Sequence, residues 1–195
     1  FEGYRVALTS LPFGSYFLHS TLIALAITVS NVVFCSMGGY AFARLKFPGR
    51  DVIFMLVLGA MLLPDQLRMV PVCRMLREMG LVDSYSSVWL VGAVAPFGLF
   101  FMRQAFLALP VELEEAARID GAGEWRIFFQ IVLPALKPIL VTLAIFSFLG
   151  AWNDFMWPLI VLSDESLQTL PVALASLSRE HVMDYELMMA GSVVT

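Results

Sequence analysis

The chain has 195 residues, of which 59% are hydrophobic and only 14% are charged, and its formal net charge is −4. Soluble domains carry about 25% charged residues, so this composition excludes a water-soluble globule and indicates an integral membrane protein. The acidic balance also excludes a nucleic-acid partner, because no basic surface is available to neutralise a phosphate backbone.

Four apolar stretches are each long enough to cross a lipid bilayer, which takes about 20 residues. They cover residues 16–43, 52–72, 86–106 and 138–162. A fifth begins near residue 185 and is cut off at Thr195, so we expect the chain to be a piece of a longer protein. Runs of this length satisfy their backbone as helices, and the alternation typical of barrel strands is absent. The prediction is one transmembrane domain over residues 1–195, an all-α polytopic bundle.

Pro64 lies inside the second stretch and is followed by Asp65 and Gln66, so we expect it to break the helix. Residues 66–79 then indicate an amphipathic or re-entrant segment that ends in a turn at Gly80 and Asp83. Two interpretations of the break remain open: a kink that lines a transport pathway, and an ordinary helix end at the membrane surface.

Lysine and arginine gather in alternate connections, which places those connections in the cytosol. The first connection carries Arg44, Lys46 and Arg50, and the long connection over residues 107–137 carries Arg118, Arg126 and Lys137. Arg68, Arg74 and Arg77 lie in a connection on the opposite side, so they reduce the difference in positive charge between the two sides. We predict a cytosolic loop at residues 107–137, called the coupling loop below.

The coupling loop begins with Pro110, a residue suited to the first position of a helix. Acidic residues at 112, 114 and 115 match the positive end of a helix dipole, and Leu113, Ala116 and Ala117 form a small apolar stripe. Gly121 and Gly123 allow a left-handed exit from this helix, and residues 124–131 indicate a second short helix. A lipid-seeking helix would carry a bulkier apolar face and a basic polar face.

The loop contains Glu115-Ala116-Ala117, then Gly121 after three residues, then Ile131-Val132-Leu133-Pro134 after nine more. This spacing resembles the EAA signature of binding-protein-dependent ABC importer permeases. Three further stretches, at residues 40–50, 63–84 and 152–159, resemble the carbohydrate branch of that family, whose MalG-like members have the MetI-like fold of type I importers. His19-Ser20 departs from the Asn-Ser common in the family.

The resemblance implies a permease subunit in the cell inner membrane, paired with an identical or different second permease, with ABC ATPase subunits and an extracytoplasmic solute-binding protein as further partners. It places ATPase coupling on the helix and turn of the loop: Glu115, Ala116, Ala117, Asp120, Gly121 and Gly123. Sugars or sugar derivatives are the expected solutes.

The sequence contains no GxxxxGK[ST] motif, so we expect ATP to be hydrolysed by a partner and no cofactor to be bound by this chain. His19 and His181 stand alone, which predicts no metal site. Nothing in the sequence assembles a catalytic set, so the chain is predicted not to be an enzyme.

The fourth stretch contains Trp152, Asn153, Asp154 and Trp157. An ionisable residue within a membrane is costly and is usually functional, so these side chains are candidates for a solute pathway. The alternative is that Asn153 and Asp154 bond neighbouring helices and that the tryptophans form an interfacial belt.

Other functions remain as alternatives. Polyamine, amino acid and metal-chelate importers share the EAA loop, although the residues at 152–159 favour the sugar branch. A membrane scaffold that recruits a soluble partner, and an intramembrane enzyme, are the alternatives from other classes.

Overall fold

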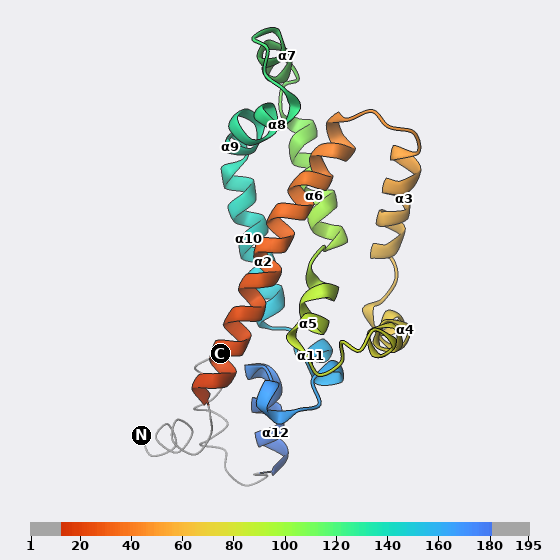
Figure 1. Cartoon of the computed structure of the whole chain (residues 1–195), viewed down its shortest axis with the longest axis vertical. Helices are drawn as coiled ribbons and strands as arrows, with labels where there is room; N and C mark the ends of the chain where they lie inside the picture. Colours follow the sequence, from red (N-terminus) through yellow and green to blue (C-terminus); the bar gives the residue numbers. More distant parts are fainter. Residues whose placement is uncertain (1–12, 181–195) are drawn as a thin grey trace. The chain divides into compact units, whose positions relative to one another are not determined.

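A computed structural model describes residues 13–180, and within that range every regular element is a helix (Figure 1). The all-α prediction is therefore confirmed. In chain order the elements are α2 (Phe13–Arg44), α3 (Arg50–Met61), α4 (Asp65–Glu78), α5 (Tyr85–Gly92), α6 (Pro96–Ala108), α7 (Glu112–Ile119), α8 (Glu124–Ile127), the π-helical turn η1 (Phe128–Val132), α9 (Leu133–Ala135), α10 (Lys137–Trp152), α11 (Met156–Val161), the 3₁₀ turn η2 (Glu165–Leu167) and α12 (Leu170–Glu180).

Among residues 13–180, two helical segments, Phe13–Arg44 and Tyr85–Ala108, are long and apolar enough to cross a membrane. Two bent pairs raise the number of spans to as many as four if each pair counts as one. In one pair α3 and α4 meet at 106°, and in the other Glu124–Ala135 and α10 meet at 79°. The predicted fifth span, from residue 185, lies outside the described residues.

The predicted second stretch, 52–72, is interrupted as expected at Pro64. Helix α3 ends at Met61 and α4 begins at Asp65, because proline cannot continue the hydrogen-bond ladder of α3. The predicted turn after α4 is present, with positive φ values of 69° at Gly80 and 56° at Asp83.

The fourth stretch ends earlier than predicted, at Trp152 instead of residue 162, and α11 follows after a short turn. Two polar side chains make this break. Asn153 Nδ2 donates to the Leu149 carbonyl at 2.8 Å, and Asp154 Oδ1 accepts from the Trp157 backbone N–H at 3.2 Å. Such side chains close one helix and open the next by satisfying their free backbone groups.

The described residues form two compact units. One comprises residues 13–26, 68–91 and 149–180, and the other comprises residues 27–67 and 92–148. All the lysines and arginines that predict a cytosolic side, from Arg44 to Lys137, belong to the second unit, whereas Arg68, Arg74 and Arg77 belong to the first.

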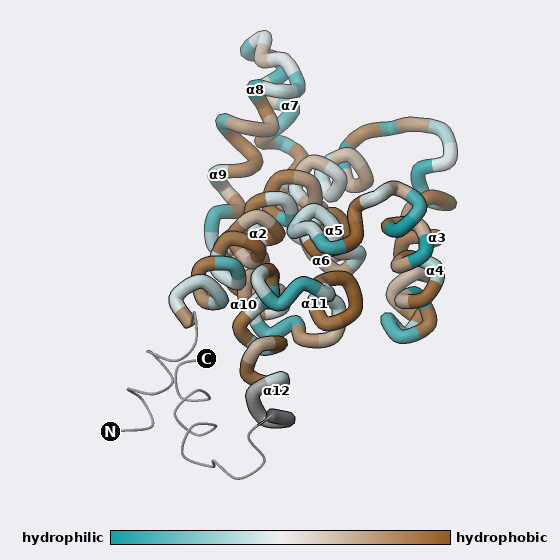
Figure 2. The backbone as a smooth tube through the Cα atoms, turned by 60° about the horizontal axis from the view of Figure 1, so that its bottom comes forward, coloured by the Kyte–Doolittle hydropathy of each residue, from teal (hydrophilic) through white to brown (hydrophobic). Residues whose placement is uncertain are grey.

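Large apolar side chains cover much of the outer surface of the helices. On α3, Met55 and Leu56 are 68% and 70% exposed, and Val141, Ile145 and Phe146 are exposed on α10. Figure 2 shows hydrophobic residues along α2, and hydrophilic and neutral residues around α7 and α8. Apolar surface of this extent is suited to lipid or to another protein and not to water.

The core of the second unit joins α2, α6, α10 and the coupling loop. Its buried members are Cys35, Tyr40, Leu99, Met102, Ala105, Phe106, Ala117, Ile127, Phe128, Val132, Leu136 and Leu143. The Tyr40 ring lies 5.5 Å from Phe106 and 5.1 Å from Phe128, measured between centroids. Cys35 is a buried free thiol, whereas Cys73, also free, is half-buried.

Helices α2 and α6 approach so closely that glycine is required between them. A Cβ atom on Gly39 would lie 2.7 Å from Met102 Cβ and 2.9 Å from the Arg103 backbone nitrogen. Because one of these atoms is backbone, a side chain at Gly39 would force the two helices apart.

We expect Gly39→Ala to destabilise the protein by about 1–3 kcal/mol through overpacking, seen as a lower thermal unfolding midpoint in detergent. Gly59→Ala on α3 is the matched control, since a Cβ there has no atom within 4 Å. It should leave the midpoint unchanged or raise it, because alanine favours the helix by about 0.5–1 kcal/mol. Equal midpoints for the two variants would contradict the close contact.

Candidate functional site

The helix of the coupling loop, α7, begins at Glu112. The prediction that Pro110 is its first residue is wrong: Leu109 has an extended backbone, and Val111 precedes the helix. The residue before a proline disfavours helical angles, so the chain needs Pro110 and Val111 to turn. The predicted acidic first turn is confirmed, with Glu112, Glu114 and Glu115.

The exit from α7 is a glycine turn, as predicted for Gly121, whose φ is +79°. Gly123 does not share this conformation. Its φ is −74° and its ψ is 162°, because it already serves as the residue before α8. The predicted second helix at 124–131 is longer than expected and continues through η1 and α9 to Ala135.

Helix α7 has one buried face, made by Glu114 and Ala117, which are 1% and 7% exposed. Residues three apart share a helix face. The other residues predicted to couple to an ATPase, Glu115, Ala116, Asp120, Gly121 and Gly123, are exposed. The predicted apolar stripe is therefore divided: Ala117 joins the core, whereas Leu113 and Ala116 face outward.

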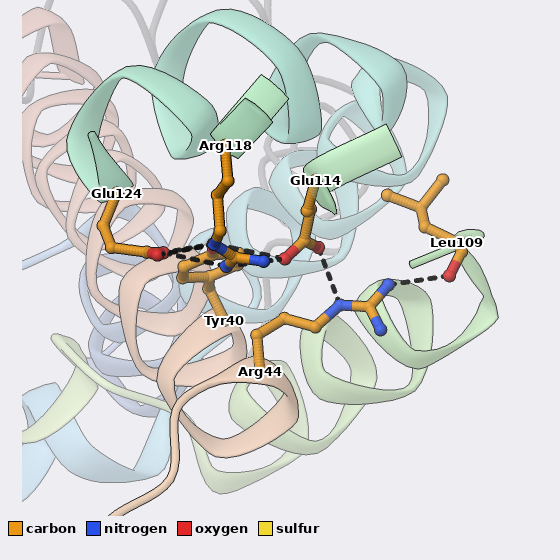
Figure 3. A network of polar contacts seen from close by, with 6 residues as sticks. All are labelled: Tyr40, Arg44, Leu109, Glu114, Arg118 and Glu124. Atoms are coloured by element: carbon orange, nitrogen blue, oxygen red, sulfur yellow. Dashed lines mark hydrogen bonds and ion pairs between the residues drawn. The ribbon is translucent and has the colours of Figure 1, made fainter. Parts of the chain in front are cut away.

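The buried Glu114 carboxylate is held by the end of α2 (Figure 3). Its Oε1 lies 2.8 Å from Arg44 Nε, and the side chain of Arg44 is only 11% exposed. Arg44 Nη2 also donates to the Leu109 carbonyl at 2.7 Å. Arg44 thus binds both the segment that enters α7 and the first turn of the helix.

A second set of bonds closes the glycine turn. Arg118 donates from Nε to Glu124 Oε1 at 2.9 Å and from Nη2 to Glu124 Oε2 at 3.2 Å, in the two-pronged geometry that guanidinium and carboxylate favour. The hydrogen bond from Arg118 holds the pKa of Glu124 below its usual 4.5. Tyr40 Oη lies 3.2 Å from Glu124 Oε2, so α2 contacts this side of the turn as well.

The sequence analysis does not predict these contacts, because the EAA spacing indicates Glu115 and not Glu114 as the functional glutamate. One part of the network has a sequence signal: Glu114 and Arg118 are four residues apart, the spacing of a helical ion pair. In the structure Arg118 Nη2 lies 3.5 Å from Glu114 Oε2. Nothing in the sequence indicates that Arg44 and Tyr40, which belong to the distant helix α2, contact these glutamates.

The outward surface of the loop carries large apolar groups as well as Glu115. Ile119 is 87% exposed and Trp125 is 67% exposed, and the Trp125 ring stacks on Phe129 with centroids 6.0 Å apart. This mixture of charge and exposed apolar groups is suited to contact with a partner protein.

The four residues proposed from the sequence to line a solute pathway differ in exposure. Trp157 is buried, and its Nε1 donates to the Ser87 carbonyl at 3.3 Å. Trp152 and Asp154 are half-buried, and the Trp152 ring packs edge-on against Phe17 at 5.3 Å. Asn153 is exposed. Within residues 13–180, no group of three or more His, Cys, Asp and Glu side chains is placed to hold a metal ion.

Comparison with known proteins agrees with this fold. Residues 35–194 match the family described as binding-protein-dependent transport system inner membrane component, and the chain belongs to this family. Together with its apolar helices, this membership makes it a membrane protein.

Among its relatives, the chain is 42% identical over 181 residues to the arabinooligosaccharides transport system permease protein AraQ of Halalkalibacterium halodurans, covering 93% of this chain and 65% of the relative. It is 36% identical over 199 residues to the diacetylchitobiose uptake system permease protein NgcG of Streptomyces coelicolor, covering 100% of this chain and 66% of the relative. It is 38% identical over 168 residues to the sn-glycerol-3-phosphate transport system permease protein UgpE of Yersinia pestis, covering 86% of this chain and 60% of the relative. The chain thus spans roughly two thirds of the length of these permeases.

A solved structure shares the fold. It is a bacterial ABC transporter involved in the import of the acidic polysaccharide alginate, matched with a TM-score of 0.84 at 23% identity over 98% of this chain and 72% of that chain.

We expect Glu114→Gln to loosen α7, because it leaves the buried Arg44 guanidinium without its counter-charge. Removing one partner of a buried ion pair costs about 3–5 kcal/mol. Hydrogen exchange of the α7 amides should become faster, and the Gly121 turn should become easier to cleave by protease. Glu112→Gln is the matched control in the same turn, since Glu112 is exposed. Unchanged exchange in Glu114→Gln would show that the ion pair does not hold the loop.

Proposed function

We propose that this chain is the permease subunit of an ABC importer for sugars or sugar derivatives, in which helix α7 docks on an ATPase subunit in the cytosol. A second permease completes the solute pathway, and an extracytoplasmic binding protein delivers the solute. The chain carries out no ATP hydrolysis itself.

The observation that carries the proposal is the two-sided character of α7. Its inner face is fixed to α2 through Glu114 and Arg44, while Glu115 and Ala116 are exposed beside it. Because α7 is fixed to α2 on its inner face, a displacement of α7 by a partner on its outer face also displaces α2. The small Ala116 allows a partner backbone to approach closely, and Glu115 offers it a charge.

Transport then requires two states, each favoured by a different ligand. ATP binding to the partner moves α7 in one direction, and the loaded binding protein favours the outward-open state from the other side of the membrane. The contacts of α7 with α2 and with the core residues Ile127 and Phe128 make the loop move together with the helices of its unit.

The proposed cargo follows from the relatives. Two of them are named for arabinooligosaccharides and diacetylchitobiose, which favours an oligosaccharide. A third is named for sn-glycerol-3-phosphate, which favours a phosphorylated polyol as the second candidate. Binding assays on the solute-binding protein that works with this chain distinguish the two candidates, and a polyamine or amino acid ligand would exclude both.

For the solute pathway, we assign the solvent-facing role among Trp152, Asn153, Asp154 and Trp157 to Asn153, with Trp152 beside it. Asn153 is exposed, whereas Asp154 caps α11 and Trp157 is buried against the Ser87 carbonyl. Asp154 and Trp157 therefore position the turn that presents Asn153.

We expect Glu115→Lys to abolish ATP-dependent uptake and to prevent co-purification of the ATPase subunit, because it reverses the charge on the docking face. The protein should still reach the membrane in normal amount. Glu165→Lys on η2 is the control, since Glu165 is an exposed acidic residue outside the coupling loop. ATPase association should be normal there. Normal uptake by Glu115→Lys would contradict docking through this face, and ATPase binding by the unaltered chain without any uptake would identify a scaffold instead.

We expect Asn153→Ala to raise the KM of uptake about three- to tenfold, the effect of losing one hydrogen bond to a neutral ligand, without changing ATPase association. Asp154→Asn keeps the oxygen that caps α11 and should transport normally. If Asp154→Asn is impaired while Asn153→Ala is not, the charge of Asp154 and not the amide of Asn153 acts on the solute.

A further inference from the structure

The third membrane segment, Tyr85–Ala108, contains a break over residues 93–95 between α5 and α6. Pro96 explains it. In a continuous helix the N–H of residue 96 would bond to the carbonyl of Gly92, four residues earlier, and proline has no N–H. Ala95, which precedes the proline, is extended, with φ −86° and ψ 128°. The Gly92 carbonyl and the Ala95 N–H therefore need partners from outside the segment.

Asn31 of α2 supplies both partners. Its Nδ2 donates to the Gly92 carbonyl at 2.7 Å, and its Oδ1 accepts from the Ala95 N–H at 2.8 Å. The amide thus takes the place of the missing proline N–H and also acts as the cap of α6. Unpaired backbone groups within a membrane are strongly unfavourable, so Asn31 stabilises the break, where Cys35 Sγ also lies 3.6 Å from the Ala95 carbonyl.

Both donor protons of the Asn31 amide are used within the protein, since the second Nδ2 proton goes to the Ile27 carbonyl at 3.1 Å. Cys35 Sγ lies 3.5 Å from Asn31 Oδ1 and 3.6 Å from the Ala95 carbonyl, and its single S–H can donate to either. An asparagine amide has two donor protons and two acceptor lone pairs. Asn31 is also only 2% exposed. The amide is therefore not accessible to solute, and two of its hydrogen bonds are made to the backbone of the break.

Close contacts connect Asn31 to the coupling loop. A Cβ on Gly98 would lie 2.9 Å from the Cys35 sulfur, and a Cβ on Gly39 would meet the backbone of α6. Helices α2 and α6 are thus packed backbone to backbone between the break and the cytosolic end of α2, where Arg44 holds Glu114. All these residues belong to the second compact unit. One of its boundaries in the chain falls between Val91 and Gly92.

We propose that Asn31 is a positioning residue for transport: it holds the break at residues 93–95 as a hinge, at which α5 changes direction when the coupling loop moves the α2–α6 pair. This inference rests on the proposed function. The packed α2–α6 pair carries the displacement of α7, and the break is the point in this segment where the backbone is free to bend without losing helical hydrogen bonds.

A pair of substitutions separates this role from simple stabilisation. Asn31→Leu removes the amide that bonds to the Gly92 carbonyl and to the Ala95 N–H. Pro96→Ala supplies the N–H that Gly92 lacks, so it closes the break from within the helix. In the full-length chain, reconstituted in proteoliposomes with its ATPase, second permease and binding protein, we compare the thermal midpoint with the number of solute molecules transported per ATP hydrolysed.

We expect Asn31→Leu to lower both quantities, and the double variant Asn31→Leu/Pro96→Ala to recover the thermal midpoint but not the transport ratio. Pro96→Ala alone should keep the midpoint and lower the transport ratio at least about fivefold, the lower end of typical coupling effects. Ser36→Ala is the control, since the buried Ser36 hydroxyl bonds only within α2, to the Val32 carbonyl. Recovery of transport in the double variant, or normal transport by Asn31→Leu, would overturn the proposal.

A measurement on the full-length chain alone tests whether Asn31 holds the break at residues 93–95, even if the proposed function fails. Spin labels at the exposed positions 91 and 97, on either side of the break, report its geometry in lipid nanodiscs. We expect one narrow distance distribution in the unaltered chain and a broad one in Asn31→Leu. Equal distributions would overturn the role of Asn31, whereas absence of ATP-dependent uptake by the unaltered proteins would overturn the proposed function instead.

Discussion

The arrangement of the coupling loop depends on the ion pair between Arg44 and Glu114. A carboxylate at 1% exposure is tolerable only when a cation compensates its lost hydration. Arg44, at the last position of α2, provides that cation and binds the Leu109 carbonyl as well. The loop can therefore sit on α2 in one register only. That register turns Glu114 and Ala117 inward and leaves Glu115 and Ala116 outward, so a buried electrostatic constraint defines the surface offered to a partner.

Polar side chains of other elements or of the turn itself also stabilise three further helix ends. Asn31 completes the backbone at residues 92–95, and Asp154 opens α11. In the first unit, Ser20 Oγ accepts from the Leu170 N–H at 2.8 Å, so a serine of α2 anchors the start of α12. At these three places a polar side chain satisfies a free backbone group, and this stabilises the interruption.

Much of the fold was predictable from local features. Apolar length indicated the membrane helices, Pro64 indicated the bend between α3 and α4, and Gly121 indicated the left-handed exit from α7. These are properties of a residue and its immediate neighbours. The errors have the same origin. Local sequence does not distinguish Gly123, which precedes the next helix, from Gly121, which ends α7. It also does not show that Asn153 and Asp154 bond backbone groups at helix ends and so divide residues 138–162.

The sequence by itself determined that this is an all-α membrane protein with an EAA loop, because composition, hydrophobic length and motif spacing are all local in the chain. Tertiary structure alone decided which glutamate is buried. Glu114 and Glu115 are adjacent and chemically identical, and only the position of Arg44, a residue 70 positions earlier than Glu114, distinguishes them. Asn31 is similar: its importance appears only where α2 passes the break before Pro96, because the groups it satisfies belong to another helix.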